Sequence, residues 1–270
     1  MGSALIKRRR ASPKAVQRAR DLSEELCLDH ICDIDAEMIA HQRGAVVQYK
    51  LLPGELGRLV RQTHGKGSVI VVRQDLCPER QRFVIMHEVG HLELHPTLNQ
   101  FKSCSEGDMV TYRGDGCEAE ANHFAAEVLM PKSLFAPLCD VREPSLRAVD
   151  HLAKTFGVSK MSAGIRFTKY CPEPCAFIFS RDKTVMWSAK SASFPFYISD
   201  RELLCARNDS FAGEFHAGKG APPDGPGIVD ADAWSDSDEA EHHMLFEHSY
   251  GWREDSSTCV MSLLWLRSDL

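Results

Sequence analysis

The sequence lacks any long apolar run, and this absence excludes a membrane-spanning helix. Such a helix needs roughly 20 consecutive apolar residues, whereas the apolar runs here are as short as Val69–Val72 and Leu263–Leu266. No apolar stretch follows the basic residues of the opening MGSALIKRRR, so the pattern of a secretory signal is missing too. We therefore expect a cytoplasmic protein with no membrane partner.

Two further absences narrow the class of protein. The chain of 270 residues has no low-complexity bias, since 43% of its residues are hydrophobic and 26% are charged, unlike a disordered, collagen-like or coiled-coil protein. Its 10 cysteines follow no regular spacing, so we interpret them as reduced thiols and not as a disulfide framework. A chain of this length can bury a core of its own, and we expect two domains.

The net charge of −6 is unevenly distributed along the chain. Residues 1–20 carry seven Lys and Arg and no Asp or Glu, whereas residues 221–258 carry ten Asp and Glu. We predict a basic flexible arm over residues 1–12 and an acidic loop over about residues 212–240, where Gly, Pro and Asp are frequent. A basic arm can touch nucleic acid, whereas an acidic stretch repels it.

Hydrophobic periodicity, together with the positions of Pro and Gly, indicates an α+β protein. The expected helices cover Pro13 to about Cys27, Ile34 to Arg43, Pro78 to Pro96, about Glu118 to Met130, Ser145–Phe156 and Lys160–Phe167. The expected strands are Ala45–Tyr49, Val69–Val72, a hairpin of Ala176–Ser180 with Val185–Trp187, and a closing strand Val260–Leu266. Between the first two strands we expect only a Gly-containing loop.

The segment His87-Glu-Val-Gly-His91 has the H-E-x-x-H pattern and lies in a helix that is apolar around most of its circumference. Positions i and i+4 share one face of a helix, so the two imidazoles can reach one Zn²⁺ at about 2.0–2.1 Å. Glu88 is turned beside the metal, where it can hold a metal-bound water and take its proton as the general base. The pattern therefore predicts a catalytic zinc site, with Mn²⁺ and Fe²⁺ as alternatives that the same ligand types accept.

A catalytic zinc site needs a third protein ligand and an open position. Glu118 is the candidate, because it begins a second helix that can pack against the first. Asn122 follows one turn later and can orient a ligand by a hydrogen bond. The spacing Asp115-x-x-Glu118 also fits a helix capping box, so on spacing alone both roles for Glu118 stay open.

Four further side chains near the motif have less direct roles. His95 lies four residues beyond His91 and immediately before a proline, so we expect it to cap the helix or to contact a ligand, a ligand role being the alternative. Glu93 points about 200° away from His91, which favours a salt bridge. His123 and Tyr112 are candidates to stabilise an oxyanion, although packing alone would also put such residues near a buried helix.

Cys104 and Cys117 flank the loop that precedes the second helix. A thiolate binds zinc well, so either one could occupy the open position and keep the site inactive until it is released. Inert packing is the alternative, because cysteine is frequent in this chain.

Two segments carry a family resemblance. The first is Arg82-Phe-Val-Ile-Met-His-Glu-Val-Gly-His-Leu-Glu-Leu-His95, and the second is Glu118-Ala-Glu-Ala-Asn-His-Phe-Ala-Ala-Glu-Val-Leu-Met-Pro131. Together they resemble the ImmA/IrrE family of bacterial metallopeptidases, over about residues 13–135. The resemblance implies a zincin-like endopeptidase in which His87, His91 and Glu118 hold the metal and Glu88 is the general base.

The same resemblance implies a substrate and an arrangement of domains. Members of the family cleave helix-turn-helix repressors of the XRE type and so switch on stress-response genes, which gives this chain a protein partner. We expect a zincin-like peptidase domain over residues 13–135, a helix-turn-helix-like segment over residues 143–170, and a small mixed α/β, GAF-like C-terminal domain with a regulatory or sensor role over residues 171–270, as in the longer IrrE-like members.

An alternative function is that of a DNA-binding transcriptional regulator with a structural or sensory metal. A helix, a turn at Gly157 and a second helix form the arrangement of a helix-turn-helix. Four cations of this segment could meet phosphates, namely Lys154, Lys160, Arg166 and Lys169. The acidic net charge argues against this function, because specific DNA binding shows a strong basic face.

Overall fold

The computed structural model describes residues 12–61, 67–96, 103–104, 116–141, 143–198 and 210–266. The chain divides into two units, one of Met1–Leu134 with Phe156–Val158 and the other of Phe135–Thr155 with Ser159–Leu270. The finer scheme of arm, peptidase domain, helix-turn-helix-like segment and C-terminal domain stays a prediction, and residues 1–11 of the arm lie outside the described residues. None of the described helices is long and apolar enough to cross a membrane.

The first unit opens with helices. Helix α1 (Pro13–Glu25) begins where Ser12 accepts a hydrogen bond from the amide of Ala15 and a proline takes the first helical position. A short 3₁₀ turn η1 (Ile31–Asp33) leads to α2 (Ala36–Gln42), which Asp35 caps by accepting from two amides of the first turn. Both predicted helices in this part of the chain are confirmed.

A four-stranded sheet follows in the order β1-β3-β2-β4. Its strands are β1 (Ala45–Lys50), β2 (Gly57–Arg61), β3 (Ser68–Arg73) and β4 (Ser103–Cys104). Strand β1 is parallel to β3, while β2 runs antiparallel to both β3 and β4. The predicted strands at β1 and β3 are confirmed, but the prediction that only a loop joins them is wrong, because β2 lies between them in the sequence and pairs with β3.

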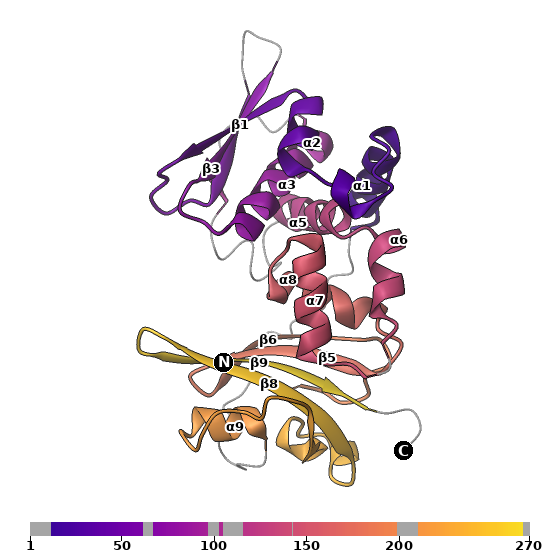
Figure 1. Cartoon of the computed structure of the whole chain (residues 1–270), viewed down its shortest axis with the longest axis vertical. Coiled ribbons are helices and arrows are strands. Elements are labelled where there is room, and N and C mark those ends of the chain that lie inside the picture. Colours follow the sequence, from indigo (N-terminus) through magenta and orange to yellow (C-terminus); the bar gives the residue numbers. More distant parts are fainter. Residues whose placement is uncertain are drawn as a thin grey trace. The chain divides into compact units, whose positions relative to one another are not determined.

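Two helices pack against each other beside this sheet. Helix α3 (Pro78–Leu94) and helix α5 (Gly116–Leu129) are in contact, and α1 contacts both of them (Figure 1). Both helices match the predicted ranges within two residues at each end. Most of α3 is buried from Val84 to His91, so the helix that carries the H-E-x-x-H pattern is central to this unit.

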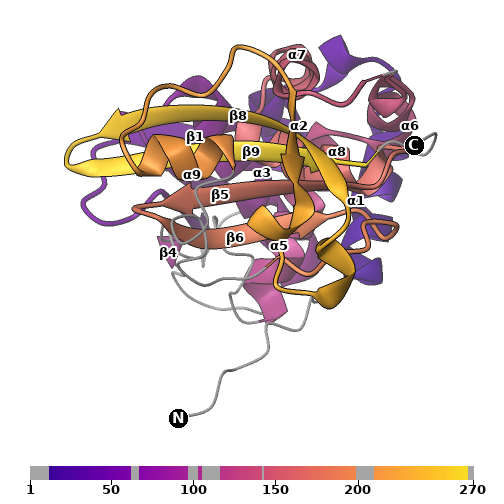
Figure 2. The same ribbon diagram turned by 90° about the horizontal axis from the view of Figure 1, so that it is seen from below.

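The second unit is built on a five-stranded antiparallel sheet in the order β6-β5-β9-β8-β7. Its strands are β5 (Cys175–Arg181), β6 (Thr184–Lys190), β7 (Gly227–Asp230), β8 (Met244–Glu254) and β9 (Ser257–Trp265). Helix α6 (Lys132–Phe135) and the 3₁₀ turn η2 (Ala136–Cys139) lead to α7 (Leu146–Phe156) and α8 (Lys160–Tyr170). Helix α8 packs on β5 and β6, and α9 (Phe211–His216) packs on β8 and β9 from the opposite face (Figures 1 and 2).

The structure corrects the prediction of an acidic loop over about residues 212–240. This stretch contains α9, β7 and two 3₁₀ turns, η4 (Ala231–Ala233) and η5 (Asp238–Ala240). The buried residues Ala231, Ala233, Trp234 and Ala240 anchor it in the core on the α9 face of the sheet. Acidic residues therefore alternate with buried apolar ones, and the composition alone conceals this alternation.

Candidate metal centre

Helix α3 positions three polar side chains in an apolar environment. The helix begins at Pro78, whose fixed φ suits the first helical position, and runs without interruption to Leu94. His87, Glu88 and His91 are 0%, 1% and 7% exposed. Because buried charged groups are rare unless they are paired or bind a metal, this burial itself points to a site.

The close approach of α5 to α3 depends on Gly90. A Cβ atom at this position would lie 3.1 Å from the Cα atom and 3.3 Å from the carbonyl oxygen of Ala121 on α5. The absence of a side chain therefore lets the two helix backbones come together one turn from Glu118. Glu118 lies in the first turn of α5 and is itself buried.

The candidate metal centre consists of His87, His91 and Glu118, which are the only described residues that meet the geometry of such a group. One possible ligand atom of each lies within 4.8 Å of those of the other two. The Nε2 atoms of the two histidines are 3.1 Å apart, and Oε2 of Glu118 is 3.1 Å from Nε2 of His87. Oε1 of Glu118 is 3.5 Å from Nε2 of His91.

The other ring nitrogen of each histidine faces a partner. Nδ1 of His87 lies 2.9 Å from Oδ1 of Asn122, which is one turn after Glu118 on α5. Since an amide oxygen only accepts, Nδ1 of His87 donates, and the lone pair of Nε2 then faces the candidate metal centre. Nδ1 of His91 lies 3.1 Å from Nδ1 of His95. The structure thus brings Asn122 and His95 next to the two histidines, and their roles stay predictions.

Glu88 is buried beside this group and differs from its neighbours. Neither of its carboxylate oxygens has a hydrogen-bond partner among the described residues. Burial raises the pKa of Glu88, His87 opposes this rise, and the negative charges of Glu118 and Glu55 add to it, so that the pKa is about 7. A carboxyl group with a pKa near neutrality is suited to accept and release a proton.

The pKa shifts of Glu118 and His91 both favour the protonation states that bind a metal ion. Burial favours the neutral form of Glu118, but the two imidazoles beside it outweigh burial and hold the pKa of this carboxyl below its usual value. Burial also lowers the pKa of His91, which favours the neutral imidazole. A carboxylate and neutral imidazoles are the protonation states that bind a divalent metal.

The structure does not bring every candidate to this group. The amide of Ser12 donates to Nδ1 of His123 at 3.3 Å, which directs this imidazole toward the start of α1. Tyr112 and the cap candidate Asp115 lie outside the described residues. Glu93 forms salt bridges with Arg18 and Arg43 at 2.6 and 2.7 Å, as the helix geometry predicts.

The two cysteine candidates are also not part of the described group. Cys117 is a free, half-buried cysteine next to Glu118, but it does not belong to the residues that meet around one point. The backbone of Cys104 pairs with Gly57 in the β4–β2 ladder, and its side chain lies outside what the structure describes. Their proposed regulatory role stays a prediction.

One residue of this network is not recognisable from the sequence motif alone. Glu120 lies on α5 between Glu118 and Asn122, and its Oε2 is 3.0 Å from Nε2 of His95. The sequence offers one signal, the spacing of Glu118 and Glu120. Two residues that are two positions apart in a helix point in different directions and so contact different neighbours. Only the fold of α5 against α3 shows that Glu120 meets a residue beyond the H-E-x-x-H pattern.

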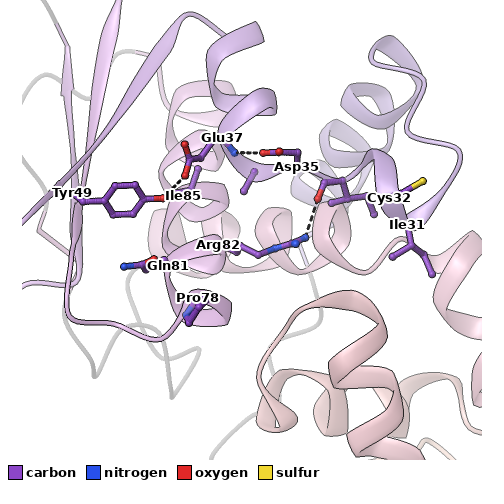
Figure 3. Close-up of a pocket in the computed structure, with 11 residues that line it drawn as sticks. Ile31, Cys32, Asp35, Glu37, Tyr49, Pro78, Gln81, Arg82 and Ile85 are labelled. Atoms are coloured by element: carbon purple, nitrogen blue, oxygen red, sulfur yellow. Dashed lines mark hydrogen bonds between the residues drawn. The ribbon is translucent and has the colours of Figure 1, made fainter.

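A separate cavity of about 390 Å³ opens between α2, β1 and the first turns of α3 (Figure 3). Within it, Arg82 donates to the carbonyl oxygen of Ile34 at 2.9 Å, and the hydroxyl of Tyr49 donates to the carboxylate of Glu37. None of the residues of the candidate metal centre lines this cavity. The cavity is therefore not part of that centre.

Comparisons with known proteins find similarity to metallopeptidases. Residues 40–168 match the family model of the IrrE N-terminal-like domain, peptidase family M78. The radiation response metalloprotease IrrE of Deinococcus radiodurans is 33% identical over 113 residues, which cover 41% of this chain and 34% of that protein. Uncharacterized immunity region protein 2 of Bacillus phage phi105 is 35% identical over 66 residues, which cover 24% of this chain and 40% of that protein.

Two further comparisons show how much of each relative is matched and which solved structure has a similar fold. The radiation response metalloprotease IrrE of Deinococcus deserti is 35% identical over 98 residues, 35% of this chain and 34% of that protein, so the matches span about a third of the IrrE relatives. A solved structure of a Mycobacterium tuberculosis transcriptional regulator aligns with a TM-score of 0.58 at 15% identity, covering 94% of this chain and 76% of that one. At this identity the likeness concerns the fold alone.

Proposed function

We propose that this chain is a zinc-dependent endopeptidase of the ImmA/IrrE family that cleaves a helix-turn-helix repressor of the XRE type, because residues 40–168 match the IrrE N-terminal-like domain. One observation carries the proposal. His87, His91 and Glu118 converge within 4.8 Å, beside the buried carboxylate of Glu88, which has no hydrogen-bond partner among the described residues.

The donor set fits a divalent zinc ion. Two imidazole nitrogens and one carboxylate are the three protein ligands of a common type of catalytic zinc site, which leaves further positions for water and substrate. The hydrogen bonds at Nδ1 of His87 and His91 leave both Nε2 lone pairs directed at the same point as the carboxylate of Glu118. Three such electron-rich atoms are stabilised by a cation between them. Imidazole and carboxylate ligands also accept Mn²⁺ and Fe²⁺, which stay the alternatives to zinc.

In this proposal the residues of the chain have separate tasks. When bound, Zn²⁺ polarises the peptide carbonyl and lowers the pKa of water to about 7. His87, His91 and Glu118 hold the ion, and Asn122 keeps the ring of His87 in place. Glu88 accepts the proton of the attacking water on a carboxylate oxygen and then delivers it to the nitrogen of the leaving amine.

The sheet edge next to Glu88 is the proposed place for the substrate backbone. Oε1 of Glu88 lies against Gly57 of β2, and at Gly57 and Arg58 this strand pairs with the two-residue strand β4. An extended peptide that continues this edge would bind through main-chain hydrogen bonds. Its scissile bond would then lie close to the general base.

The identity of the substrate class rests on the relatives. Two of them carry the name radiation response metalloprotease, and a third belongs by its name to an immunity region of a phage. Both descriptions fit the control of genes by removal of a repressor. The partner of this chain would then be a protein, and the outcome of cleavage would be the expression of repressed genes.

The alternative of a DNA-binding regulator has less support from the second unit. Lys154 and Lys160 both form salt bridges with Asp150, at 2.6 and 2.8 Å. Arg166 is 7% exposed and lies over the ring of Tyr170. Lys169 lies over the same ring. Because all four cations have partners within the unit, we propose that the pair α7 and α8 is a scaffold and not a reader of DNA.

The decisive experiment combines metal content with cleavage. We expect about one zinc per chain in the wild-type protein and none in His91→Ala, measured by elemental analysis after purification. The zinc-loaded wild type should then cleave one member of a panel of purified XRE-type repressors, detected by mass spectrometry, and His91→Ala should cleave none. A wild type that binds neither Zn²⁺ nor Mn²⁺ would refute the proposal.

A further inference from the structure

The buried face of α3 continues beyond its second metal-ligand candidate into a chain of hydrogen bonds. Nδ1 of His91 is 3.1 Å from Nδ1 of His95, and Nε2 of His95 is 3.0 Å from Oε2 of Glu120 on α5. The other carboxylate oxygen of Glu120 accepts from the hydroxyl of Ser12 at 3.0 Å. These contacts join α3, α5 and the start of α1 in one row of polar groups.

The direction of every donor in this row follows from its far end. A carboxylate only accepts, so Nε2 of His95 donates to Glu120. A neutral imidazole that is protonated at Nε2 offers a lone pair at Nδ1, and Nδ1 of His91 must therefore donate to His95. The remaining nitrogen of His91, Nε2, is then the unprotonated one, and it faces His87 and Glu118.

We propose that Glu120 and His95 are positioning residues for zinc: their hydrogen bonds fix the ring orientation and the tautomer of His91, so that its Nε2 lone pair faces the metal. This inference rests on the proposed function, because it assigns a role toward the metal of that same centre. His87 obtains the same result from Asn122 in one step, whereas His91 obtains it through a second imidazole. The two ligands are thus oriented by two different devices on α5.

A purely structural role for His95 would depend on its backbone and not on its side-chain hydrogen bonds. His95 is the C-terminal cap residue of α3, and its amide donates to the carbonyl oxygen of His91. That contact involves only the backbone and would survive a change in the charge of residue 120. A loss of metal affinity when the carboxylate of Glu120 is replaced is therefore not explained by the cap.

The anchoring of Glu120 explains why it is a reliable acceptor. The hydroxyl of Ser12 donates to Glu120 and also accepts the amide of Ala15, so it caps α1 and holds the carboxylate at the same time. The side chain of Glu120 is 27% exposed, whereas that of His95 is 7% exposed. The row thus leads from the candidate metal centre to a partly exposed carboxylate that two hydrogen bonds hold in place.

The test measures zinc affinity in competition with a chromogenic chelator. Glu120→Gln keeps the size of the side chain but replaces a carboxylate, which only accepts, with an amide, which can also donate to Nε2 of His95 and so no longer fixes the tautomers of His95 and His91. We expect zinc to bind at least about tenfold more weakly, in the range found for groups that orient metal ligands. Glu127→Gln is the matched control, because Glu127 is a buried acid on the same helix that pairs with Arg20. It should leave zinc affinity unchanged.

A second measurement needs no variant and keeps the inference testable if Glu120→Gln folds poorly. Long-range ¹H–¹⁵N correlation spectra of the zinc-loaded wild type should show His91 protonated at Nδ1, and His95 protonated at Nε2 but not at Nδ1. A proton on Nδ1 of His95 would overturn the inference. So would equal zinc affinity of Glu120→Gln and wild type, which leaves the peptidase proposal intact. A wild type that binds zinc no better than His91→Ala would refute both.

Discussion

A buried glutamate in the first unit and one in the second differ in how their carboxylates are hydrogen-bonded. Glu88 in the first unit is 1% exposed, and Glu247 in the second unit is 0% exposed. Glu247 accepts four hydrogen bonds, from the amides of Phe211 and Ala212, the indole of Trp234 and the hydroxyl of Ser249. Glu88 accepts none from the described residues.

The difference separates a structural carboxylate from a reactive one. Burial raises the pKa of both groups above the ordinary value of a carboxyl. At Glu247 the four donors compensate the loss of water, so the group links β8 to the first turn of α9 and to the indole of Trp234. At Glu88 the described residues provide no such compensation, and a buried polar group without a partner persists where function requires it.

The largest expected effect comes from Glu88→Gln. The change keeps the shape of the side chain but removes the proton acceptor, so cleavage of the repressor substrate should slow by about 10²–10⁴-fold. Zinc content should stay at the wild-type level, because Glu88 is not a ligand candidate, and the free energy of unfolding should not fall, because no hydrogen bond from the described residues is lost. Cleavage time courses, elemental analysis and urea unfolding check the three statements. Retained proteolysis in the zinc-loaded variant would refute the role of Glu88.

Glu247→Ala should give the opposite pattern. Four buried donors lose their acceptor, and we expect the free energy of unfolding to fall by about 3 kcal/mol. Zinc affinity per folded molecule should not change, because Glu247 lies in the other unit. Glu254→Ala is the control on the same strand, since this exposed acid makes only a loose ion pair with Arg181 at 3.6 Å and should cost under about 1 kcal/mol. Equal losses in the two variants would contradict the contrast with Glu88.

The sequence predicts the part of the site that local spacing determines, but not the part that depends on contacts between distant segments. The H-E-x-x-H spacing fixes which side chains share one helical face, and the apolar residues around it predict burial, so the bounds of α3 and the grouping of His87 with His91 follow from local rules. Glu118 needs a second helix in contact with the first, and spacing alone could not separate a ligand from a capping box. Only the family resemblance favoured the ligand role before the structure put Glu118 next to both histidines.

Long-range pairing explains the elements that were missed. Strand β2 carries two arginines among five residues, and it is a strand because β3 and β4 flank it. Strand β8 places Glu247 and Ser249 on its inner face, which breaks the usual apolar alternation. The polar inner face is stable only because α9 and Trp234 supply donors from distant positions. Local patterns fail here because the partners of these residues are remote in sequence.

The smallest expected effects distinguish two helical glycines, Gly90 of α3 and Gly164 of α8. A Cβ at Gly164 would lie 2.4 Å from the ring of Phe177, whereas a Cβ at Gly90 would lie 3.1 Å from the backbone of α5. Replacing either glycine by alanine gains about 1 kcal/mol of helix propensity. Overpacking costs about 1–3 kcal/mol, and the severe overlap at Gly164 puts it at the upper end of this range.

We therefore expect Gly164→Ala to lower the free energy of unfolding by about 1–2 kcal/mol, and Gly90→Ala to leave it nearly unchanged. Zinc affinity should respond in the reverse order. A shift of a few tenths of an ångström between α3 and α5 moves Glu118 away from His87 and His91, so Gly90→Ala should weaken zinc binding while Gly164→Ala should not. Urea unfolding and chelator competition on the two variants measure both quantities. If Gly164→Ala weakened zinc binding, or if Gly90→Ala left it unchanged, the spacing of α3 and α5 would not set the geometry of the metal centre.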